Sequence, residues 1–318
     1  MNGGPHPSMS EVMKIAVTGG AGFIASHVAD AFVAAGHDVL VIDNLSSGRR
    51  ENVPARAEFV QADIRDDAAG VAVREFAPQV LCHHAAQMDV RRSVREPLYD
   101  AEVNVLGTLR MLEASPTLER VIFASSGGAI YGEQDEFPAT ESHAQQPASP
   151  YGASKAAGEI YLRTYAQTRG LKAVALRYAN VYGPRQNPHG EAGVVAIFCE
   201  RLVRGEACFI NGDGEQTRDY VFVGDVVRAN LAALASEQLG AVNIGTGIET
   251  SVNQLYAQLA DSAGVSAKAQ HRETALGEQR RSVISAARAK AWWGYAPRVA
   301  LADGLAQTFS YFKKRNGS

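Results

Sequence analysis

The chain has 318 residues, of which 46% are hydrophobic and 20% are charged, as in an ordinary soluble globular protein. Its formal net charge of −3 gives no polybasic signature, so neither nucleic acid nor an anionic membrane is expected as a partner. No apolar run reaches 18 residues, so no transmembrane helix is expected.

Residues 1–12 are rich in Gly, Pro and Ser, and they lack a basic-then-apolar signal pattern. We expect a flexible N-terminal extension there, with the fold starting near Met13. The three cysteines, Cys82, Cys199 and Cys208, are widely spaced and odd in number. This pattern favours free thiols in a reducing cytoplasm over a disulfide framework or a zinc site. We therefore expect a cytoplasmic protein without a bound metal.

The first half of the chain alternates short apolar runs with longer helical stretches. The runs typical of buried strands are residues 14–18, 38–42, 58–61, 79–83, 120–125 and 172–176. Helical stretches lie between them, notably over residues 94–114 and 151–169. Parallel strands need crossover connections, and a helix is the usual one. The alternation therefore predicts an α/β fold with a Rossmann-type doubly wound parallel sheet.

After Arg177 the alternation becomes less regular, and loops rich in Gly and Pro appear. Short strands are expected at residues 208–211, 221–223 and 242–244, the last two returning to the main sheet. The tail from residue 251 onward has a mixed α and β pattern. A second, smaller mixed α/β lobe built from interleaved segments follows from this pattern.

Two domains are therefore predicted after the N-terminal extension. The Rossmann domain, which contains the main sheet, is expected over residues 13–178 plus 217–247. The lobe that binds the substrate is expected over residues 179–216 plus 248–318.

The glycine-rich turn TGGAGFIAS, residues 18–26, lies where the first strand becomes the first helix. Glycine permits the tight turn and lets a pyrophosphate approach the backbone, while the helix N-terminus offers N–H groups and the positive end of its dipole. In this strand–turn–helix context the pattern indicates dinucleotide binding rather than a generic turn. We expect cofactor contacts from Gly19, Gly22, Phe23 and Ile24.

Asp43 stands at the end of the second predicted strand, about 20 residues after the turn. A carboxylate there accepts hydrogen bonds from the adenosine ribose and repels a 2′-phosphate, which favours NAD over NADP. Arg49 and Arg50 follow and could bind that phosphate, but the acid occupies the direct position.

Tyr151 and Lys155 lie four residues apart in YGASK, at the start of a predicted helix. Positions i and i+4 share a helix face, so the phenol and the ammonium can meet over one site. A cation about 4 Å away stabilises a phenolate by roughly 4 kcal/mol at an effective dielectric constant of about 20. That would bring the tyrosine pKa from ~10 to about 7. Tyr151 is therefore the predicted general base, with Lys155 lowering its pKa and anchoring the ribose.

Together these motifs resemble the extended short-chain dehydrogenase/reductase family, and within it the UDP-glucose 4-epimerase branch. The resemblance extends from about Met13 to the C-terminus. Its further motifs are DNLSSG (43–48), Asp63-Ile64, HHAAQ (83–87), NVLGT with Asn104, SSGGAIYG (125–132), RYANVYGPRQ (177–186) and TRDYVFVGDV (217–226).

The resemblance implies roles for many further residues. Contacts to NAD are implied for Asn44, Ser46, Gly48, Asp63, Ile64, Ala85, Ala86, Gln87, Asn104 and Tyr178. Contacts to a UDP-sugar are implied for Ser126, Asn180, Val194, Arg218, Glu278 and Ser282. In the family pattern, Asn180 and Arg218 hold the nucleotide diphosphate, and Tyr178 lies by the nicotinamide.

The chain departs from the family pattern within the turn and at the catalytic motif. Ala25 replaces the third glycine of the turn, a change that closer packing can absorb. The family's catalytic Ser/Thr aligns with Gly127, so its role either passes to the neighbouring Ser126 or is absent.

Two further departures concern positions that bind the substrate in the family. The family arginine that binds the diphosphate aligns with Ala275, and Arg272 or Arg280 could substitute for it. The family aspartate on the uridine ribose aligns with Glu278.

The motif SSGGAIYG distinguishes among branches of the family. Similar sugar 4,6-dehydratases carry an acidic pair at the places of Gly128 and Ala129, and similar decarboxylases carry a glutamate at Ala129. Both of those reactions need an additional acid or base. Small residues leave only oxidation and re-reduction at C4, which predicts an NAD-dependent UDP-hexose 4-epimerase.

Substrate breadth and assembly follow from the same resemblance. Epimerases restricted to plain hexoses carry a bulky residue at the place of Ser282, so this small side chain predicts activity on UDP-N-acetylglucosamine as well as UDP-glucose. The apolar faces of residues 94–114 and 151–169 predict a homodimer, because the family pairs these helices between subunits as a four-helix bundle.

Two alternatives to this function remain open at the level of sequence. One is another UDP-sugar-modifying enzyme, such as a UDP-glucuronate 4-epimerase, which would need a cation for the carboxylate. The other is a catalytically silent NAD-responsive binding protein, although Tyr151 and Lys155 are not needed merely to fold.

Overall fold

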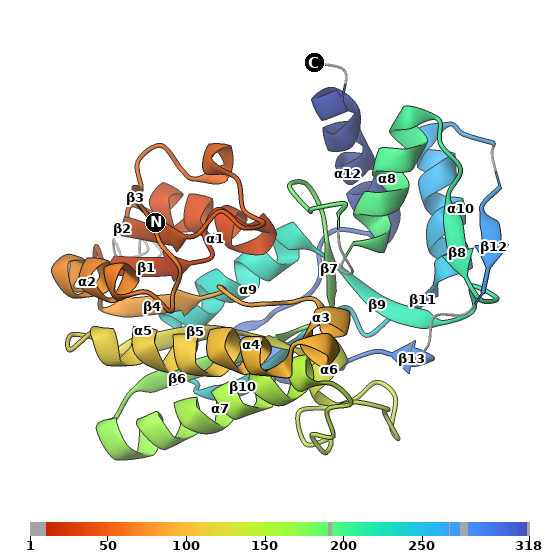
Figure 1. Ribbon diagram of the computed structural model, residues 1–318. Coiled ribbons are helices and arrows are strands. Elements are labelled where there is room, and N and C mark those ends of the chain that lie inside the picture. The colour runs from red at the N-terminus through yellow and green to blue at the C-terminus, as the bar shows by residue number, and fades with distance from the viewer. Residues whose placement is uncertain (1–10, 190–192, 267, 274–278, 317–318) are drawn as a thin grey trace, which may run out of the picture.

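The computed structural model describes residues 11–189, 193–266, 268–273 and 279–316. Figure 1 shows a large sheet with helices on both faces and, on the right, a smaller lobe that contains α8, α10 and α12. Two sequence expectations lie outside the described residues, namely the substrate contact expected from Glu278 and the departure at Ala275. Most of the predicted N-terminal extension also lies outside them.

The main sheet is parallel throughout, as the alternating pattern predicted. Its strands, among the described residues, follow the order β10-β6-β5-β4-β1-β2-β3. They are β1 (Lys14–Thr18), β2 (Asp38–Asp43), β3 (Glu58–Gln61), β4 (Val80–His83), β5 (Arg120–Ser126), β6 (Lys172–Tyr178) and β10 (Gly240–Ile244). The strand order reverses between β1 and β4, and ligands of open α/β sheets bind at the carboxyl ends beside such a point. The predicted fold class is confirmed.

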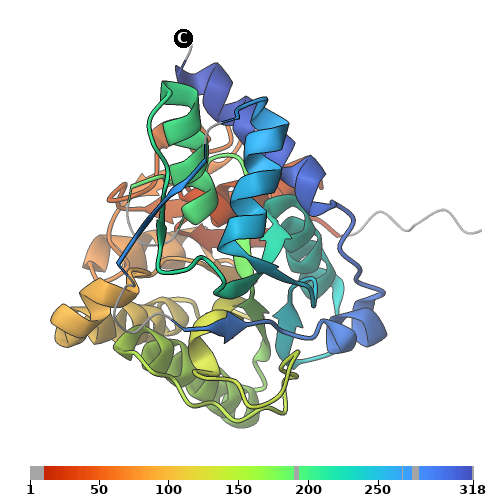
Figure 2. The ribbon, with the colours of Figure 1, turned by 90° about the vertical axis from the view of Figure 1, so that its right-hand side faces the viewer.

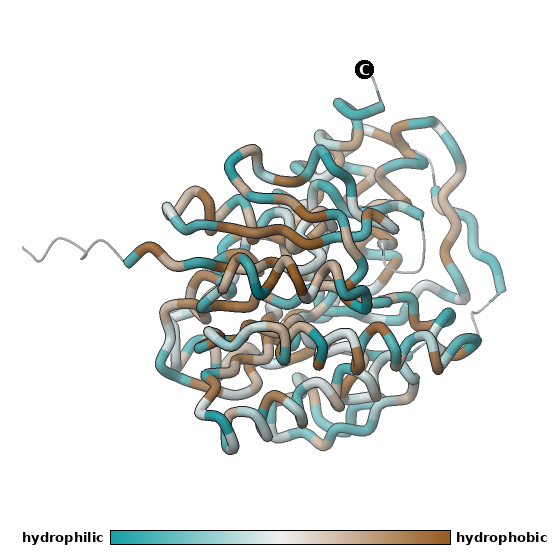
Figure 3. Tube along the Cα trace, turned by 60° about the vertical axis from the view of Figure 1, so that its left-hand side comes forward, coloured by the Kyte–Doolittle hydropathy of each residue, from teal (hydrophilic) through white to brown (hydrophobic). Residues whose placement is uncertain are grey.

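Helices cover both faces of this sheet, because successive strand residues point to opposite sides. One face carries α1 (Phe23–Ala34), α9 (Val223–Ala235) and α11 (Ala287–Trp293). The other carries α2 (Asp67–Phe76), α5 (Thr108–Ala114) and α7 (Pro150–Arg169). Ile15 and Val17 belong to the first apolar core, whereas Ala16 belongs to the second. This double burial explains the continuous apolar runs of the strands, which form the brown centre of Figure 3.

Residues 97–114 are helical as expected, but the helix expected over residues 94–114 is interrupted at Glu96. The segment is divided into α3 (Val90–Arg95), α4 (Pro97–Ala101), the π-helical turn η2 (Glu102–Gly107) and α5. Pro97 has no N–H group, and a proline disfavours helical backbone at the residue before it. Glu96 accordingly has φ −131° and ψ 60°. The chain bends there, so α3 and α4 are separate helices beside α7.

The smaller lobe is built around a second sheet. In that sheet β9 (Thr217–Phe222) lies between β11 (Glu249–Ser251) and β13 (Arg281–Ser282), and it also pairs with β7 (Asn180–Tyr182). A two-stranded sheet joins β8 (Phe209–Asn211) to β12 (Gln270–Arg272). The helices α8 (Val194–Arg204), α10 (Val252–Ala263) and α12 (Leu301–Asn316) pack over these strands (Figure 2). Two short elements complete the chain, the 3-10 turn η1 (Arg50–Asn52) and α6 (Gly127–Ile130).

The strand expected at residues 242–244 does return to the main sheet as β10, but the strand expected at 221–223 does not. It is β9, and it pairs with β7 instead. Local apolar character is the same for both strands, so only the pairing partner decides which sheet each one joins. The segment 217–247 is therefore divided between the two sheets.

We expect Gly158→Ala to destabilise the protein, because α7 packs closely on β5 there. A Cβ at residue 158 would lie 2.6 Å from a ring carbon of Phe123. Overpacking of this kind costs about 1–3 kcal/mol of the free energy of unfolding. Gly70 in α2 is the matched control, since a Cβ there meets nothing closer than 3.5 Å.

Gly70→Ala should instead stabilise the protein by about 0.5–1 kcal/mol through helix propensity. Urea unfolding midpoints of the two variants measure the contrast. Equal stabilisation by both changes would contradict the close packing of α7.

Candidate active site

The glycine-rich turn is shaped by contact with the loop after β4. Gly19 has φ +71°, and a Cβ there would lie 2.8 Å from the backbone nitrogen of Ala85. Only glycine suits both the backbone conformation and this approach. The helix α1 begins at Phe23 and carries no acidic residue in its first turn. Its N–H groups and positive dipole end can therefore bind an anion, and this cradle fits a pyrophosphate.

The third turn position, Ala25, is absorbed by packing as expected. It is 2% exposed and lies in the apolar core between the sheet and α9. Phe23 packs instead against the core of the smaller lobe, so the first turn of α1 contacts both parts of the molecule.

Asp43 is buried at the carboxyl end of β2 and is hydrogen-bonded to the glycine-rich turn. Its Oδ2 accepts from the backbone of Ala21 at 3.0 Å, and its Oδ1 accepts from the backbone of Leu45 at 2.8 Å. Burial raises the pKa of this carboxyl, and the backbone hydrogen bonds oppose that rise. Gly48 lies so close that a Cβ there would come within 2.9 Å of Asp43 Oδ1.

The two arginines that could have bound a 2′-phosphate have other partners. Arg49 pairs with Glu51 at 3.5 Å, and Arg50 lies over the ring of Phe59, 4.5 Å from its centroid. These contacts agree with the preference for NAD that Asp43 indicates.

Several of the residues expected to contact NAD follow the ends of β2 and β3. Asn44 donates to Asp63 at 2.9 Å, and Arg65 pairs with the same carboxylate at 2.9 Å. The Arg65 hydrogen bond lowers the pKa of Asp63 to about 2. Ile64 is buried against Gly107, where a Cβ would lie 2.7 Å from Ile64 Cδ1. Ser46 is exposed on the same rim.

The structure brings Ser126, Tyr151 and Lys155 together at the carboxyl end of β5. Ser149 caps α7 by accepting from the backbone of Gly152 at 3.2 Å, which places Tyr151 in the first helical turn. The hydroxyl of Ser126 is hydrogen-bonded to the phenol of Tyr151. Lys155 Nζ donates to the carbonyl of Ala124 at 2.9 Å.

The expectation that Lys155 brings the pKa of Tyr151 to about 7 was wrong for this arrangement. Burial raises that pKa to about 12, the charge of Asp100 adds to the rise, and the Ser126 hydrogen bond opposes it. The ammonium points at Ala124 and lies 5.9 Å from the centroid of the Tyr151 ring. Burial also lowers the pKa of Lys155 to about 8. Desolvation of both groups outweighs the attraction between them.

A larger residue at Gly127, the place aligned with the family's Ser/Thr, would have to displace the side chain of Ile284. A Cβ there would lie 2.7 Å from Cδ1 of Ile284. Ser126 is instead the hydroxyl that reaches the phenol, while Ser125 points to Glu159 with an Oγ–Oε1 distance of 2.6 Å. The two neighbouring serines therefore have different surroundings.

Tyr178 ends β6 beside Ser126 and is fixed by buried polar partners. Its hydroxyl lies 3.0 Å from Nε2 of His84 and accepts from Nδ2 of Asn230 at 2.9 Å. Burial lowers the pKa of His84 to about 3, so its ring is neutral at physiological pH. This network orients the Tyr178 ring at the floor of the site.

Two of the residues expected to contact the UDP-sugar, Ser282 and Asn180, lie close to Gly128. A Cβ there would lie 3.7 Å from Oγ of Ser282 and 3.8 Å from Oδ1 of Asn180. Arg218 and Ser282 are register partners on β9 and β13. Val194 opens α8 and packs against the core of the smaller lobe.

The two arginines considered as substitutes for the family's diphosphate ligand are engaged elsewhere. Arg272 Nε donates to Asn211 at 2.6 Å. Arg280 pairs with both carboxylate oxygens of Asp213, at 2.8 and 3.0 Å. Of the three arginines, Arg218 is the one whose strand lies beside Ser282.

Sequence reasoning missed two carboxylates that lie near Tyr151 and Lys155. Glu159 follows Lys155 by four residues and pairs with Arg177 at 2.6 Å. Asp100 precedes Asn104 by four residues and accepts from its amide at 3.0 Å. The i, i+4 spacing could have pointed to Glu159, whereas Asp100 is recognisable only once α4 is packed against α7.

The described part of the chain holds no group of three or more His, Cys, Asp or Glu side chains that could bind a metal ion. Nor does any described helix combine the length and the apolar character that crossing a membrane requires. All three cysteines are buried free thiols.

Known proteins resemble this chain in sequence and in structure. The NAD dependent epimerase/dehydratase family matches residues 15–245. The UDP-glucose 4-epimerase of Mycolicibacterium smegmatis is 45% identical over 312 residues, which cover 96% of this chain and 100% of that protein. The crystal structure of UDP-glucose 4-epimerase from Thermotoga maritima with UDP-glucose has a TM-score of 0.93 and 47% identity, covering 96% of this chain and 100% of the other. The Thermus thermophilus UDP-glucose 4-epimerase complex with NAD has a TM-score of 0.90 and 45% identity, covering 95% and 99%.

Proposed function

The chain belongs to the NAD-dependent epimerase/dehydratase family, and we propose that it is a UDP-hexose 4-epimerase that interconverts UDP-glucose and UDP-galactose. The observation that carries the proposal is the meeting of Ser126, Tyr151 and Lys155 beside Gly128. The site has a base for one hydroxyl proton and small residues at the places where related dehydratases and decarboxylases carry an acid. That set suits oxidation and re-reduction at one carbon, with no elimination step.

The groups expected to hold the cofactor lie along the carboxyl ends of the strands. Gly19, Gly22 and the N-terminus of α1 would hold the pyrophosphate, and Asp43 the adenosine ribose. When bound, NAD supplies the hydride acceptor and donor for C4 of the sugar. Tyr178, fixed by His84 and Asn230, would lie beside the nicotinamide.

The protein's own part is to move one proton and to hold the sugar. Tyr151 accepts the proton of the C4 hydroxyl as C4 is oxidised, and it returns that proton after the 4-keto sugar has turned over about its phosphate link. Ser126 donates a hydrogen bond that lowers the pKa of Tyr151. Lys155, which donates to Ala124, places its ammonium 5.9 Å from the centroid of the Tyr151 ring. Asn180 and Arg218 would hold the diphosphate at the edge of the smaller lobe.

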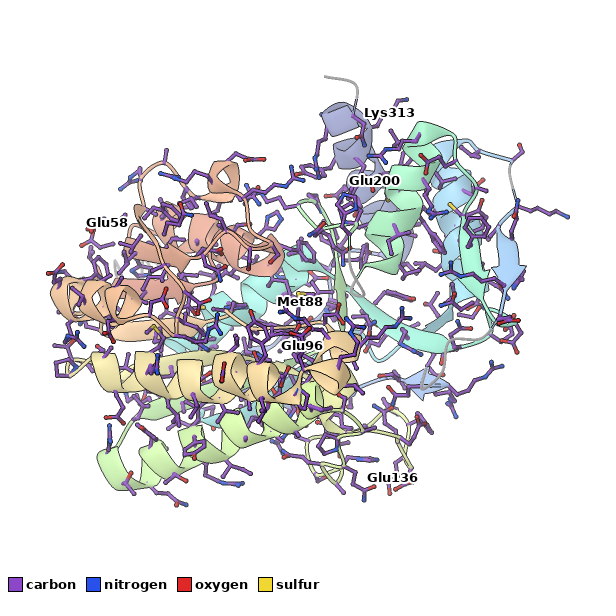
Figure 4. The ribbon with its side chains drawn as sticks, viewed as in Figure 1. Glu58, Met88, Glu96, Glu136, Glu200 and Lys313 are labelled. Atoms are coloured by element: carbon purple, nitrogen blue, oxygen red, sulfur yellow. The ribbon has the colours of Figure 1, made fainter. Side chains whose placement is uncertain are left out.

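We also propose a location and an assembly. Three buried free thiols suit the reducing cytoplasm, where thiols stay reduced. For assembly we propose a homodimer through one apolar face. Its exposed residues are Val90, Val94, Leu98, Leu106, Ile160 and Tyr161, from α3, α4, η2 and α7. Figure 4 shows Met88 and Glu96 on this side of the molecule, and Met88 is itself 51% exposed.

The test of the proposed reaction is Tyr151→Phe, assayed with a panel of UDP-sugars whose products are resolved by NMR. Phenylalanine keeps the ring packing and removes the proton acceptor, so turnover should fall about 10²–10⁴-fold. The NAD that co-purifies with the protein should stay at the wild-type level. Turnover within a few-fold of wild type would rule out Tyr151 as the base, and a wild-type enzyme active only on UDP-glucuronate would replace UDP-glucose as the substrate.

We expect alanine substitutions of the neighbouring serines, Ser125 and Ser126, to have different effects. Ser126→Ala should lower turnover by about tenfold or more, because a hydrogen bond to a charged group contributes about 1.5–3 kcal/mol. Ser125→Ala should leave turnover closer to wild type and lower the unfolding midpoint, because it leaves the buried Glu159 short of a donor. Turnover and urea unfolding of both variants separate the two roles. Equal, near-neutral effects would show that neither serine has taken over the role of the family's Ser/Thr.

We expect Ser282 to set the width of the sugar pocket. Its hydroxyl lies 3.7 Å from where a Cβ at Gly128 would be. If this small side chain borders the sugar at C2, an N-acetyl group should fit there, and the wild type should also act on UDP-N-acetylglucosamine. Ser282→Tyr should remove that activity by steric exclusion and spare UDP-galactose. Loss of both activities in proportion, or of neither, would show that Ser282 is not the gate.

The homodimer is tested by Leu98→Glu, which places a charge on a side chain that is 79% exposed at the centre of α4. We expect a monomer mass by light scattering at micromolar concentration, against a dimer mass for wild type. Leu239→Glu is the control, because Leu239 is 43% exposed before β10 and away from this face. A monomeric wild type, or a dimer that survives Leu98→Glu, would contradict the assignment.

A further inference from the structure

Asp100 is a carboxylate that solvent does not reach, at 0% exposure, in the middle of α4. Its Oδ2 accepts from the hydroxyl of Ser154 at 2.6 Å. Its Oδ1 accepts from the side-chain amides of Gln87 and Asn104, each at 3.0 Å. A buried carboxylate is tolerated only with such partners, and these three are neutral donors that leave its negative charge uncancelled.

These hydrogen bonds join three separate elements at one point. Gln87 lies in the loop after β4, and its backbone nitrogen donates to Asn104 Oδ1 at 2.9 Å. Asn104 lies in η2 and donates back to the carbonyl of Gln87 at 2.9 Å. Ser154 lies in α7, directly before Lys155. The loop on the cofactor side and the catalytic helix, which lies beside α4 in Figure 1, are therefore fixed to the same carboxylate.

The charges that face Lys155 come from each element around it. From α7 itself comes Glu159, whose charge is paired with Arg177 at 2.6 Å. From β4 and the residue after it come His83 and His84, both with a pKa lowered to about 3 and therefore neutral. From α4 comes Asp100. Burial lowers the pKa of Lys155 to about 8, and Asp100 is the largest influence that raises it.

We propose that Asp100 is a positioning residue of this active site: its buried carboxylate holds α7 against the loop after β4 and supplies the negative charge that keeps Lys155 a cation at neutral pH. The consequence for catalysis rests on the proposed epimerase function, because it is the charge of Lys155 that would stabilise the Tyr151 phenolate. The same carboxylate raises the pKa of Tyr151. Removing it should therefore lower the pKa of both groups and move both limbs of a pH–rate profile toward acid.

The experiment compares wild type with Asp100→Asn, which keeps the shape and removes the charge. The first readout is the titration of Lys155 in the protein as purified, followed by NMR of ¹³Cε-labelled lysine and assigned with Lys155→Arg. The midpoint should fall by about one pH unit, the size expected for a unit charge a few ångströms beyond contact. The second readout is the pH dependence of UDP-glucose turnover, whose alkaline limb should move toward neutral by the same interval.

Ser154→Ala is the matched control, since it removes one hydrogen bond of the cluster and keeps the carboxylate. It should leave the Lys155 midpoint in place, whatever it does to stability. If Asp100→Asn does not fold, the ¹³Cγ resonance of Asp100 in wild type replaces it, and that resonance should change position as Lys155 titrates.

An unmoved Lys155 midpoint in Asp100→Asn, or an Asp100 ¹³Cγ resonance that does not respond as Lys155 titrates in wild type, would overturn the inference even if the enzyme epimerises UDP-glucose. If the wild type shows no epimerase activity but the Lys155 midpoint still shifts in Asp100→Asn, the proposed function is overturned. The electrostatic role of Asp100 is then supported.

Discussion

The arrangement of the site depends on the hydrogen bond from the buried ammonium of Lys155 to the carbonyl of Ala124. It ties α7 to the carboxyl end of β5, and the close packing of Gly158 on Phe123 one turn later keeps the helix against the sheet. Because Tyr151 lies one turn before Lys155, this contact decides where the phenol stands. If α7 were held farther from the sheet, even the long side chain of Lys155 could not reach the end of β5.

Burial strengthens the electrostatic interactions within this site, and it also makes each charged group in the site costly in free energy. In the protein interior, interactions between charges are stronger, yet every charged group must first lose its hydration. Two carboxylates lie around Lys155. Glu159 is paired with Arg177, and Asp100 is hydrogen-bonded to neutral donors. The two histidines after β4 stay neutral and add no positive charge. The balance of charge is thus set by residues from four elements, not by the Tyr–Lys pair alone.

The smaller lobe is positioned by a second buried carboxylate. Asp219 in β9 is 1% exposed and accepts from the backbone of Thr246 and Gly247 at 2.9–3.1 Å, and from the Thr246 hydroxyl at 2.6 Å. Thr246 and Gly247 follow β10 of the main sheet, so this carboxylate joins the two sheets at the seam. Its neighbour Arg218 and the paired Ser282 are thereby held beside the main sheet, with Oγ of Ser282 3.7 Å from where a Cβ at Gly128 would lie.

The sequence by itself determined the parallel sheet, the dinucleotide turn, Asp43 and the pair Tyr151 and Lys155. These features depend on local rules, namely apolar runs of strand length, glycine at a tight turn, and i, i+4 spacing on a helix. Tertiary structure decided what depends on contacts between distant segments. It assigned β9 to the second sheet, placed Ser126 beside the phenol of Tyr151, packed Ile284 against Gly127 and brought Asp100 to α7. It also decided the pKa of Tyr151, since desolvation depends on everything packed around a group and not on its neighbours along the chain.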